Sequence, residues 1–120
     1  MIVTSFSWVM PAEHSTIGFK STIRITNGLT VYRHRLSGKT IIDTTNPIAD
    51  KPPVNGVIQY FTTFGESLLE KLQILAPGAH LVKAFNSIGN AFMIDPEFES
   101  RPTMFICGNN ASAKKETASL

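Results

Sequence analysis

The sequence predicts an α/β fold with a mostly parallel sheet and flanking helices. Three short runs of apolar residues, at 40–43, 80–85 and 103–107, are typical of buried strands. A helical pattern separates the first two runs, and a second helical pattern follows the third. Strands of a parallel sheet are covered on both faces by helices, so near-continuous apolar runs favour this arrangement.

The first strand is expected at Thr40–Asp43, a run rich in β-branched residues that ends before the turn dipeptide Asn46-Pro47. Residues 51–62 contain two adjacent prolines and an Asn-Gly pair. These residue types disfavour regular structure, so we expect a long connection there.

The first helix is predicted to begin at Thr63-Phe64-Gly65-Glu66, which has the Ser/Thr-x-x-Glu spacing of a capping box. Leu68, Leu72 and Leu75 then fall on one helical face. Pro77-Gly78 ends the helix, because proline cannot continue it.

The same alternation of apolar runs and turn residues predicts the remaining elements. A second strand is expected at His80–Phe85, followed by an amide-rich loop, and a third strand at Thr103–Cys107. A second helix is expected over Ala111–Leu120, with Asn110 as its N-cap residue.

The chain divides into residues 1–38, an atypical N-terminal segment, and residues 39–120, the α/β part. Alternating apolar residues flank the turn pair Asn27-Gly28 in the first segment: Ile23, Ile25, Leu29 and Val31. This pattern predicts a β-hairpin that precedes the sheet.

Composition excludes several classes of function. Cys107 is the only cysteine, so an intrachain disulfide and a cysteine-based metal site are excluded, and the three histidines lack metal-ligand spacing. The net charge is +2, and the scattered cations before Gly38 are typical of a solvated face rather than of a nucleic-acid interface. No run approaches the roughly 20 apolar residues of a membrane helix, so we expect a cytoplasmic protein without a membrane partner.

Amide and hydroxyl side chains follow the predicted strands, with Asn46, Asn86 and Asn109 each in the loop after one strand. In open α/β sheets ligands bind at the carboxyl ends of the strands, so these loops are expected to share one rim. The rim has few titratable groups, which suits hydride transfer better than hydrolysis. The alternative is a purely structural role, in which Asn46 is a turn residue and Asn86 caps the turn after its strand.

Lys83 is unusual, because it lies between apolar residues in a predicted buried strand. A cation there must either reach solvent with its ammonium or find an anion. Lys83 is therefore a candidate for contact with a ligand or a partner.

Three segments carry a resemblance to a known family. They are Asp43–Asp50 (DTTNPIAD), Lys83–Ala91 (KAFNSIGNA) and Pro102–Asn109 (PTMFICGN). In this order they resemble NADP-dependent oxidoreductases related to deazaflavin-dependent NADP reductase, with the likeness covering residues 36–120. The cytosolic domain of the six-transmembrane ferric reductases looks like a relative that shares the Lys-Ala-Phe-Asn run.

The resemblance implies a partial Rossmann-like domain that binds NADP and transfers hydride between NADP and a flavin-like or other small acceptor. It places Asn46 and Pro47 beside the nicotinamide, and Lys83, Asn86 and Ser87 at the next strand end, near the nicotinamide or the acceptor. It assigns no catalytic residue and no metal. The preference for NADP over NAD comes from the resemblance alone.

The chain departs from the family pattern at the pyrophosphate-binding turn. Gly18, Gly28 and Gly38 are ten residues apart, and no Gly-x-Gly-x-x-Gly motif is present. Without that loop and its helix dipole, NADP affinity is expected to fall by orders of magnitude. We therefore interpret the chain as the carboxyl-terminal part of an oxidoreductase domain, inactive alone.

A second hypothesis belongs to a different class. A sheet with open edges can pair with another chain or with a second copy of itself. Under this hypothesis the chain is a non-catalytic interaction module that self-associates through its sheet edges.

Overall fold

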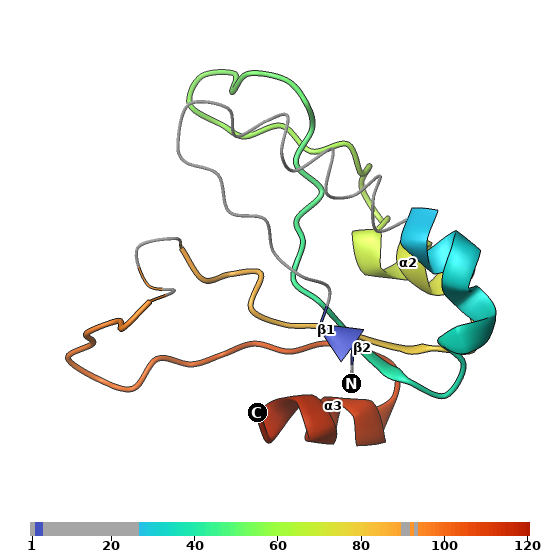
Figure 1. The fold of residues 1–120 in the computed structure, drawn as a ribbon. Helices are drawn as coiled ribbons and strands as arrows, with labels where there is room; N and C mark the ends of the chain where they lie inside the picture. The colour runs from blue at the N-terminus through green and yellow to red at the C-terminus, as the bar shows by residue number, and fades with distance from the viewer. Residues whose placement is uncertain (1, 4–26, 90–91, 93) are drawn as a thin grey trace.

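The computed structural model describes residues 2–3, 27–89, 92 and 94–120 (Figure 1). Its strands are β1 (Ile2–Val3), β2 (Thr40–Asp43) and β3 (His80–Lys83). They form a parallel sheet in the order β1-β2-β3. The predicted α/β class, with a parallel sheet and flanking helices, is confirmed.

The centre of the sheet is β2, and its four residues are all buried. In the parallel register Ile41 lies opposite Leu81, and Ile42 lies opposite Val82. Successive strand residues point to opposite faces, so Ile41 and Leu81 serve one face while Ile42 and Val82 serve the other. Full burial of β2 places Asp43, its last residue, inside the protein with 3% of its surface exposed.

Two helices flank this sheet on opposite sides (Figure 1), α2 (Leu68–Leu75) and α3 (Ala111–Ala118). Leu68 and Leu72 of α2 are buried in one core cluster with Ile41 and Leu81. Helix α3 contacts β3 and buries only small side chains, Ala113 and Thr117. Asn110 caps α3 as predicted, because its Oδ1 accepts a hydrogen bond from the Ala113 amide at 2.8 Å.

Helix α2 begins four residues later than predicted. The Thr63 hydroxyl does donate to Glu66 Oε2 at 2.7 Å, but this pair closes a turn instead of a helix. Gly65 has φ +84°, in the left-handed region where an α-helix cannot continue. The capping box is formed by the next copy of the same spacing, Ser67 and Glu70.

In that box the Glu70 amide donates to Ser67 Oγ at 3.1 Å, and the Ser67 amide donates to Glu70 Oε2 at 3.0 Å. Each partner thus satisfies an amide that the first helical turn leaves unpaired. The bond from the Ser67 side chain, followed by that from its backbone, holds the pKa of the Glu70 carboxyl below its usual range.

The predicted hairpin is wrong in its second strand. Residues 27–32 are helical and lead into the 3-10 helix η1 (Arg33–Arg35), while Ile23 and Ile25 lie outside the described residues. A strand would place Leu29 and Val31 on the same face, but Leu29 is 4% exposed and Val31 is 68% exposed. Leu29 packs in the core cluster beside α2, and this burial favours the helical period over the alternating one.

The predicted third strand is also wrong. Within residues 103–107 only Cys107 pairs with β3, through one antiparallel bridge to Lys83. The two residues exchange backbone hydrogen bonds of 2.8 and 3.1 Å. Met104 and Phe105 are 40% and 75% exposed, and Ile106 is only half-buried, so the run is not buried as a strand inside the sheet would be. An apolar composition does not by itself make a run a strand of the sheet, because that also requires pairing along its length, and here only Cys107 is paired.

We expect Ser67→Ala to lower the free energy of unfolding by about 1 kcal/mol, because it removes the N-cap acceptor of α2. Chemical denaturation followed by circular dichroism measures the change. Thr63→Ala is the matched control, since Thr63 only closes the turn before the helix. An equal loss in both variants would contradict the assignment of the cap to Ser67.

Candidate functional site

The carboxyl ends of β2 and β3 lie side by side, because Asp43 is paired with Lys83 in the parallel register. The Ala84 amide donates to the Asp43 carbonyl at 3.1 Å and extends the ladder by one residue. The two loops that follow therefore leave the sheet at the same edge, as expected for a parallel pair. This edge is the candidate site.

An ion pair joins the two strand ends. Lys83 Nζ donates to Asp43 Oδ2 and also to the Thr45 carbonyl, the latter at 2.7 Å. Asp43 Oδ1 accepts from the amide of Thr45 at 3.0 Å and from its hydroxyl at 2.7 Å. We call these three residues, Asp43, Thr45 and Lys83, the ionic link.

The ionic link satisfies charges that would otherwise be costly to bury. The side chains of Asp43 and Lys83 are 3% and 13% exposed. A buried charge is tolerated when it is paired and its remaining hydrogen-bonding capacity is used. Lys83 thus finds an anion within its own chain, and contact of its ammonium with a cofactor stays a prediction.

Beyond the link, Asn46, one residue after Thr45, and Asn86, three residues after Lys83, bond to each other. Asn46 Nδ2 donates to the Asn86 carbonyl at 2.8 Å, and Asn86 Nδ2 donates to Asn46 Oδ1 at 3.1 Å. We call these two residues the amide pair. It connects positions 40 residues apart and crosses between the two loops, so two of the predicted site residues are brought together.

The amide pair leaves polar groups for a ligand. An Asn side chain has two N–H donors and an oxygen with two lone pairs. Within the described part of the chain, the Asn86 Oδ1 and one N–H of each amide make no protein hydrogen bond. Ser87 follows with an exposed side chain, and Pro47 lies half-buried beside Asn46. Together these groups can bind a small planar amide.

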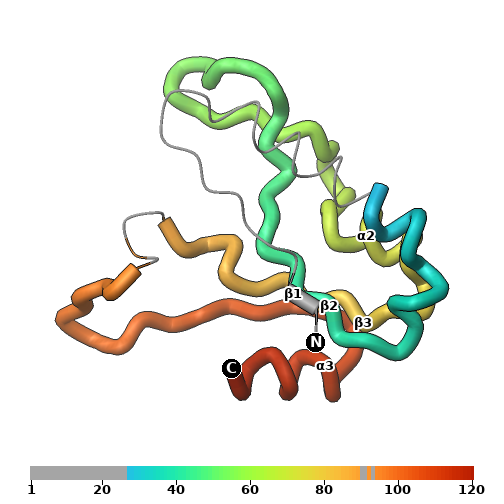
Figure 2. The backbone as a smooth tube through the Cα atoms, viewed as in Figure 1, coloured from blue at the N-terminus to red at the C-terminus, as the bar shows by residue number. Residues whose placement is uncertain are grey.

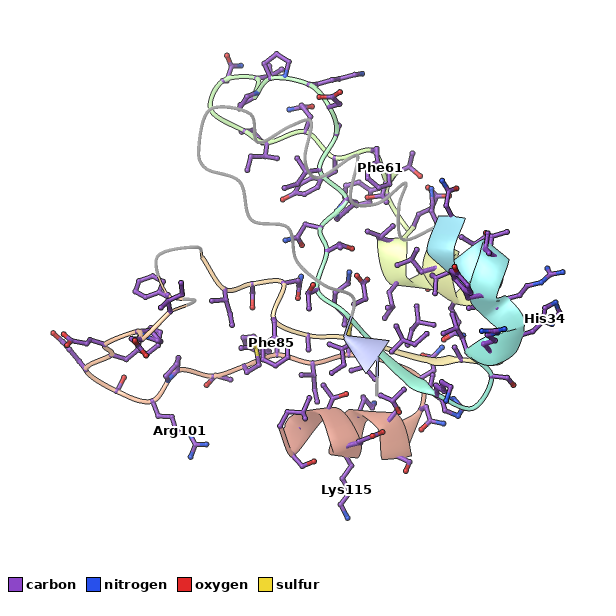
Figure 3. All side chains as sticks on the ribbon, in the orientation of Figure 1. His34, Phe61, Phe85, Arg101 and Lys115 are labelled. Atoms are coloured by element: carbon purple, nitrogen blue, oxygen red, sulfur yellow. The ribbon has the colours of Figure 1, made fainter. Side chains whose placement is uncertain are left out.

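Phe85 determines how the second loop leaves the sheet. The sequence predicts Phe85 as the last residue of a strand, but β3 ends at Lys83 and Phe85 has φ +60°. A bulky side chain in the left-handed region costs about 1–3 kcal/mol, and such strain is concentrated at functional sites. Figure 3 shows the Phe85 side chain beside the end of the strand, where it is 38% exposed. No sequence signal marked this conformation.

Asn109 does not join this rim. The chain passes Lys83 in the antiparallel direction and continues toward His80, where Asn110 Nδ2 lies 3.2 Å from His80 Nδ1. A Cβ at Gly108 would be 2.7 Å from the Leu81 carbonyl oxygen, so the loop is closely applied to β3. The prediction that all three loops share one rim is wrong for Asn109, because it assumed a parallel third strand.

Sequence reasoning missed Asp43 and Thr45 as parts of the site. The sequence pattern marks Asp43 only as the end of a strand, although a buried carboxylate needs a partner. The available signal was its charge relation to Lys83: each is the fourth residue of a short apolar strand, and the two charges are opposite.

The described residues contain neither a candidate metal site nor a membrane-spanning helix. Over residues 2–3, 27–89, 92 and 94–120, no three His, Cys, Asp or Glu side chains are grouped so that they could hold a metal ion. Among the same residues, no helix is long and apolar enough to cross a membrane.

The fold is similar to two solved structures. A candidate F420-dependent NADP reductase from Arthrobacter sp. FB24 is 27% identical, with a TM-score of 0.66 over 85% of this chain and 45% of that one. A hypothetical protein from Sinorhizobium meliloti is 24% identical, with a TM-score of 0.54 over 78% of this chain and 46% of that one. The chain therefore spans less than half the length of either protein. No family model matches it.

The two likenesses support different statements. The second establishes a similarity of fold alone, because its sequence identity is low. The first relates the chain to a Rossmann-like oxidoreductase and agrees with the small parallel sheet and its flanking helices (Figure 2). Fold and distant likeness do not by themselves assign an activity, which must be argued from the strand-end residues.

We expect Lys83→Met to lower the free energy of unfolding by about 3 kcal/mol, because it leaves the Asp43 charge buried without its partner. Adding Asp43→Asn should restore part of the loss, since no buried charge then remains. Urea denaturation of the two variants measures both effects.

Lys71→Met is the matched control for that experiment. Lys71 pairs with Glu66 at 3.0 Å, but both side chains are exposed and screened by solvent. Its loss should be much smaller than that of Lys83→Met. Equal losses in the two variants would contradict the role given to the ionic link.

Proposed function

We propose that this chain forms the nicotinamide side of the cofactor cleft in an NADP-dependent oxidoreductase, which transfers hydride between NADP and a flavin-like or other small acceptor. The observation that carries the proposal is the amide pair, Asn46 and Asn86, at the carboxyl ends of two adjacent parallel strands. Ligands of open α/β sheets bind at this edge. The likeness to a candidate F420-dependent NADP reductase supports the same chemistry.

The residues present suit the nicotinamide end of the cofactor. A carboxamide has one acceptor oxygen and two N–H donors. Among the described residues, the amide pair leaves one N–H of each side chain and the Asn86 Oδ1 acceptor for it. Ser87 adds a hydroxyl, while Pro47 adds a rigid apolar surface next to Asn46. NADP when bound supplies the hydride chemistry, and the protein supplies binding and orientation.

The role of Lys83 in this proposal is mainly indirect. Two of its three N–H donors are used by Asp43 and Thr45; contacts within the described residues leave the third for a cofactor or an acceptor. The ion pair also gives the edge no free general base, because the Asp43 oxygens accept from Lys83 and Thr45. An edge of this kind favours hydride transfer over chemistry that begins with removal of a proton.

The pyrophosphate half of the cofactor lacks its usual sequence signal. The chain contains no Gly-x-Gly-x-x-Gly motif, whose backbone amides and helix dipole bind the phosphates. We therefore propose that the chain alone binds NADP weakly and does not turn over. The NADP preference follows the resemblance and the neighbour's description, not a phosphate-binding group of this chain.

Reduced nicotinamide mononucleotide is the probe that isolates the proposed half-site. We expect it to shift the NMR signals of the Asn46 and Asn86 side-chain amides, and Asn86→Ala to weaken binding about tenfold, the effect of roughly one lost hydrogen bond. Asn109→Ala is the matched control, because Asn109 is exposed at the other end of β3, and it should bind like the parent.

NADPH should bind little more tightly than the mononucleotide, because the sequence lacks the glycine-rich motif that binds the pyrophosphate. Saturation by NADPH in the micromolar range would contradict the proposed inactivity of the chain. Equal weakening by Asn86→Ala and Asn109→Ala would contradict the proposed site itself.

A further inference from the structure

His80 connects β3 to the beginning of α3, away from the proposed cofactor edge. Asn110 Oδ1 accepts from the Ala113 amide at 2.8 Å, which fixes the orientation of the Asn110 side chain. Its Nδ2 therefore faces His80 Nδ1, at 3.2 Å. Since an amide nitrogen can only donate, Nδ1 must be the acceptor. The contact requires a neutral imidazole with its proton on Nε2.

Protonation of His80 removes this acceptor. Nδ1 would then carry a proton that points at the N–H of Asn110, so two donors would face each other. Rotating the Asn110 amide would offer oxygen to the histidine, but it would also abolish the N-cap bond to Ala113. The positive end of the α3 dipole further disfavours a cation at this position.

Among the described residues, no group around His80 forms an ion pair with it or accepts its proton in a hydrogen bond. From α2, Glu70 lines a groove beside His80, where its Oε2 accepts from the amide and hydroxyl of Ser67 at 3.0 and 2.7 Å; no ion pair or hydrogen bond joins it to His80. Cys107, in the loop before α3, also lines this groove. Lys39, just before β2, contacts His80 through its carbonyl, which accepts from the His80 amide. The first turn of α3 carries Lys114, a like charge for imidazolium.

We propose that His80 is a pH-sensitive latch for helix α3: the neutral imidazole holds the helix N-terminus on the sheet, and protonation releases it. The helix is well suited to such control, because it buries only Ala113 and Thr117 and so has little apolar packing to hold it in place. Protonation of His80 thus loosens α3 while the sheet and α2 stay folded.

Hydrogen exchange of the full chain measures this directly, as protection of α3 amides relative to α2 amides at about pH 7.5 and about pH 5.5. Helix α2 is a suitable reference, because Ser67 holds the pKa of Glu70 below its usual 4.5 and the cap stays ionised at both values. We expect the protection ratio to fall about fivefold on acidification, the effect of one net hydrogen bond.

Three variants separate the latch from a general effect of pH. His80→Asn places an amide oxygen near the Nδ1 position, where it accepts from Asn110 but cannot be protonated, so the ratio should not depend on pH. His34→Asn is the matched control, since His34 is exposed in η1 and points away from the sheet (Figure 3), and it should behave like the parent. Asn110→Asp keeps the cap but offers a carboxylate to His80, so acidification should tighten α3.

Nitrogen chemical shifts of the His80 ring report the tautomer independently of stability. A proton on Nδ1 at about pH 7.5 would overturn the proposal. An unchanged protection ratio in the parent, or the same fall in His80→Asn as in the parent, would overturn it as well. All of these results are independent of nicotinamide binding at the opposite end of β3.

Discussion

The ion pair between Asp43 and Lys83 is the interaction on which the arrangement of the strand ends depends. Both charges lie at the last residues of adjacent parallel strands, and both are largely shielded from solvent. They are stable there because Thr45 folds back over them, donating to Asp43 and accepting from Lys83. The first turn of the loop after β2 is thereby fixed, in a region where loops are ordinarily mobile.

That fixed turn has a consequence for the neighbouring residues. Asn46 follows Thr45 directly, and Asn86 follows Lys83 after the strained turn at Phe85. Both amides can therefore be oriented before any ligand arrives, and each orients the other through a reciprocal bond. Preorganised polar groups bind a ligand without first losing their own conformational entropy. The physical basis of the proposed nicotinamide site is this rigidity rather than any unusual acidity or basicity.

The sequence predicted features that depend on local pattern. It identified β2 with its observed bounds and the N-cap of α3, because apolar runs and capping side chains act over a few residues. It was wrong where tertiary packing decided between two local patterns, as at Leu29, whose burial beside α2 favours a helix. It was also wrong about the direction of the chain at Cys107, which local pattern does not encode. Asn46 and Asn86 were both named, but their mutual bond depends on a strand register that no motif expresses.

The central claim is that the ionic link positions the amide pair. A double-mutant cycle between Lys83→Met and Asn46→Ala, read from the free energy of unfolding, tests it most directly. If the link positions the pair, the two losses are coupled by at least about 1 kcal/mol, since the second substitution removes a contact that the first has already disordered. Losses that add to within about 0.5 kcal/mol would show two independent contacts and contradict the claim.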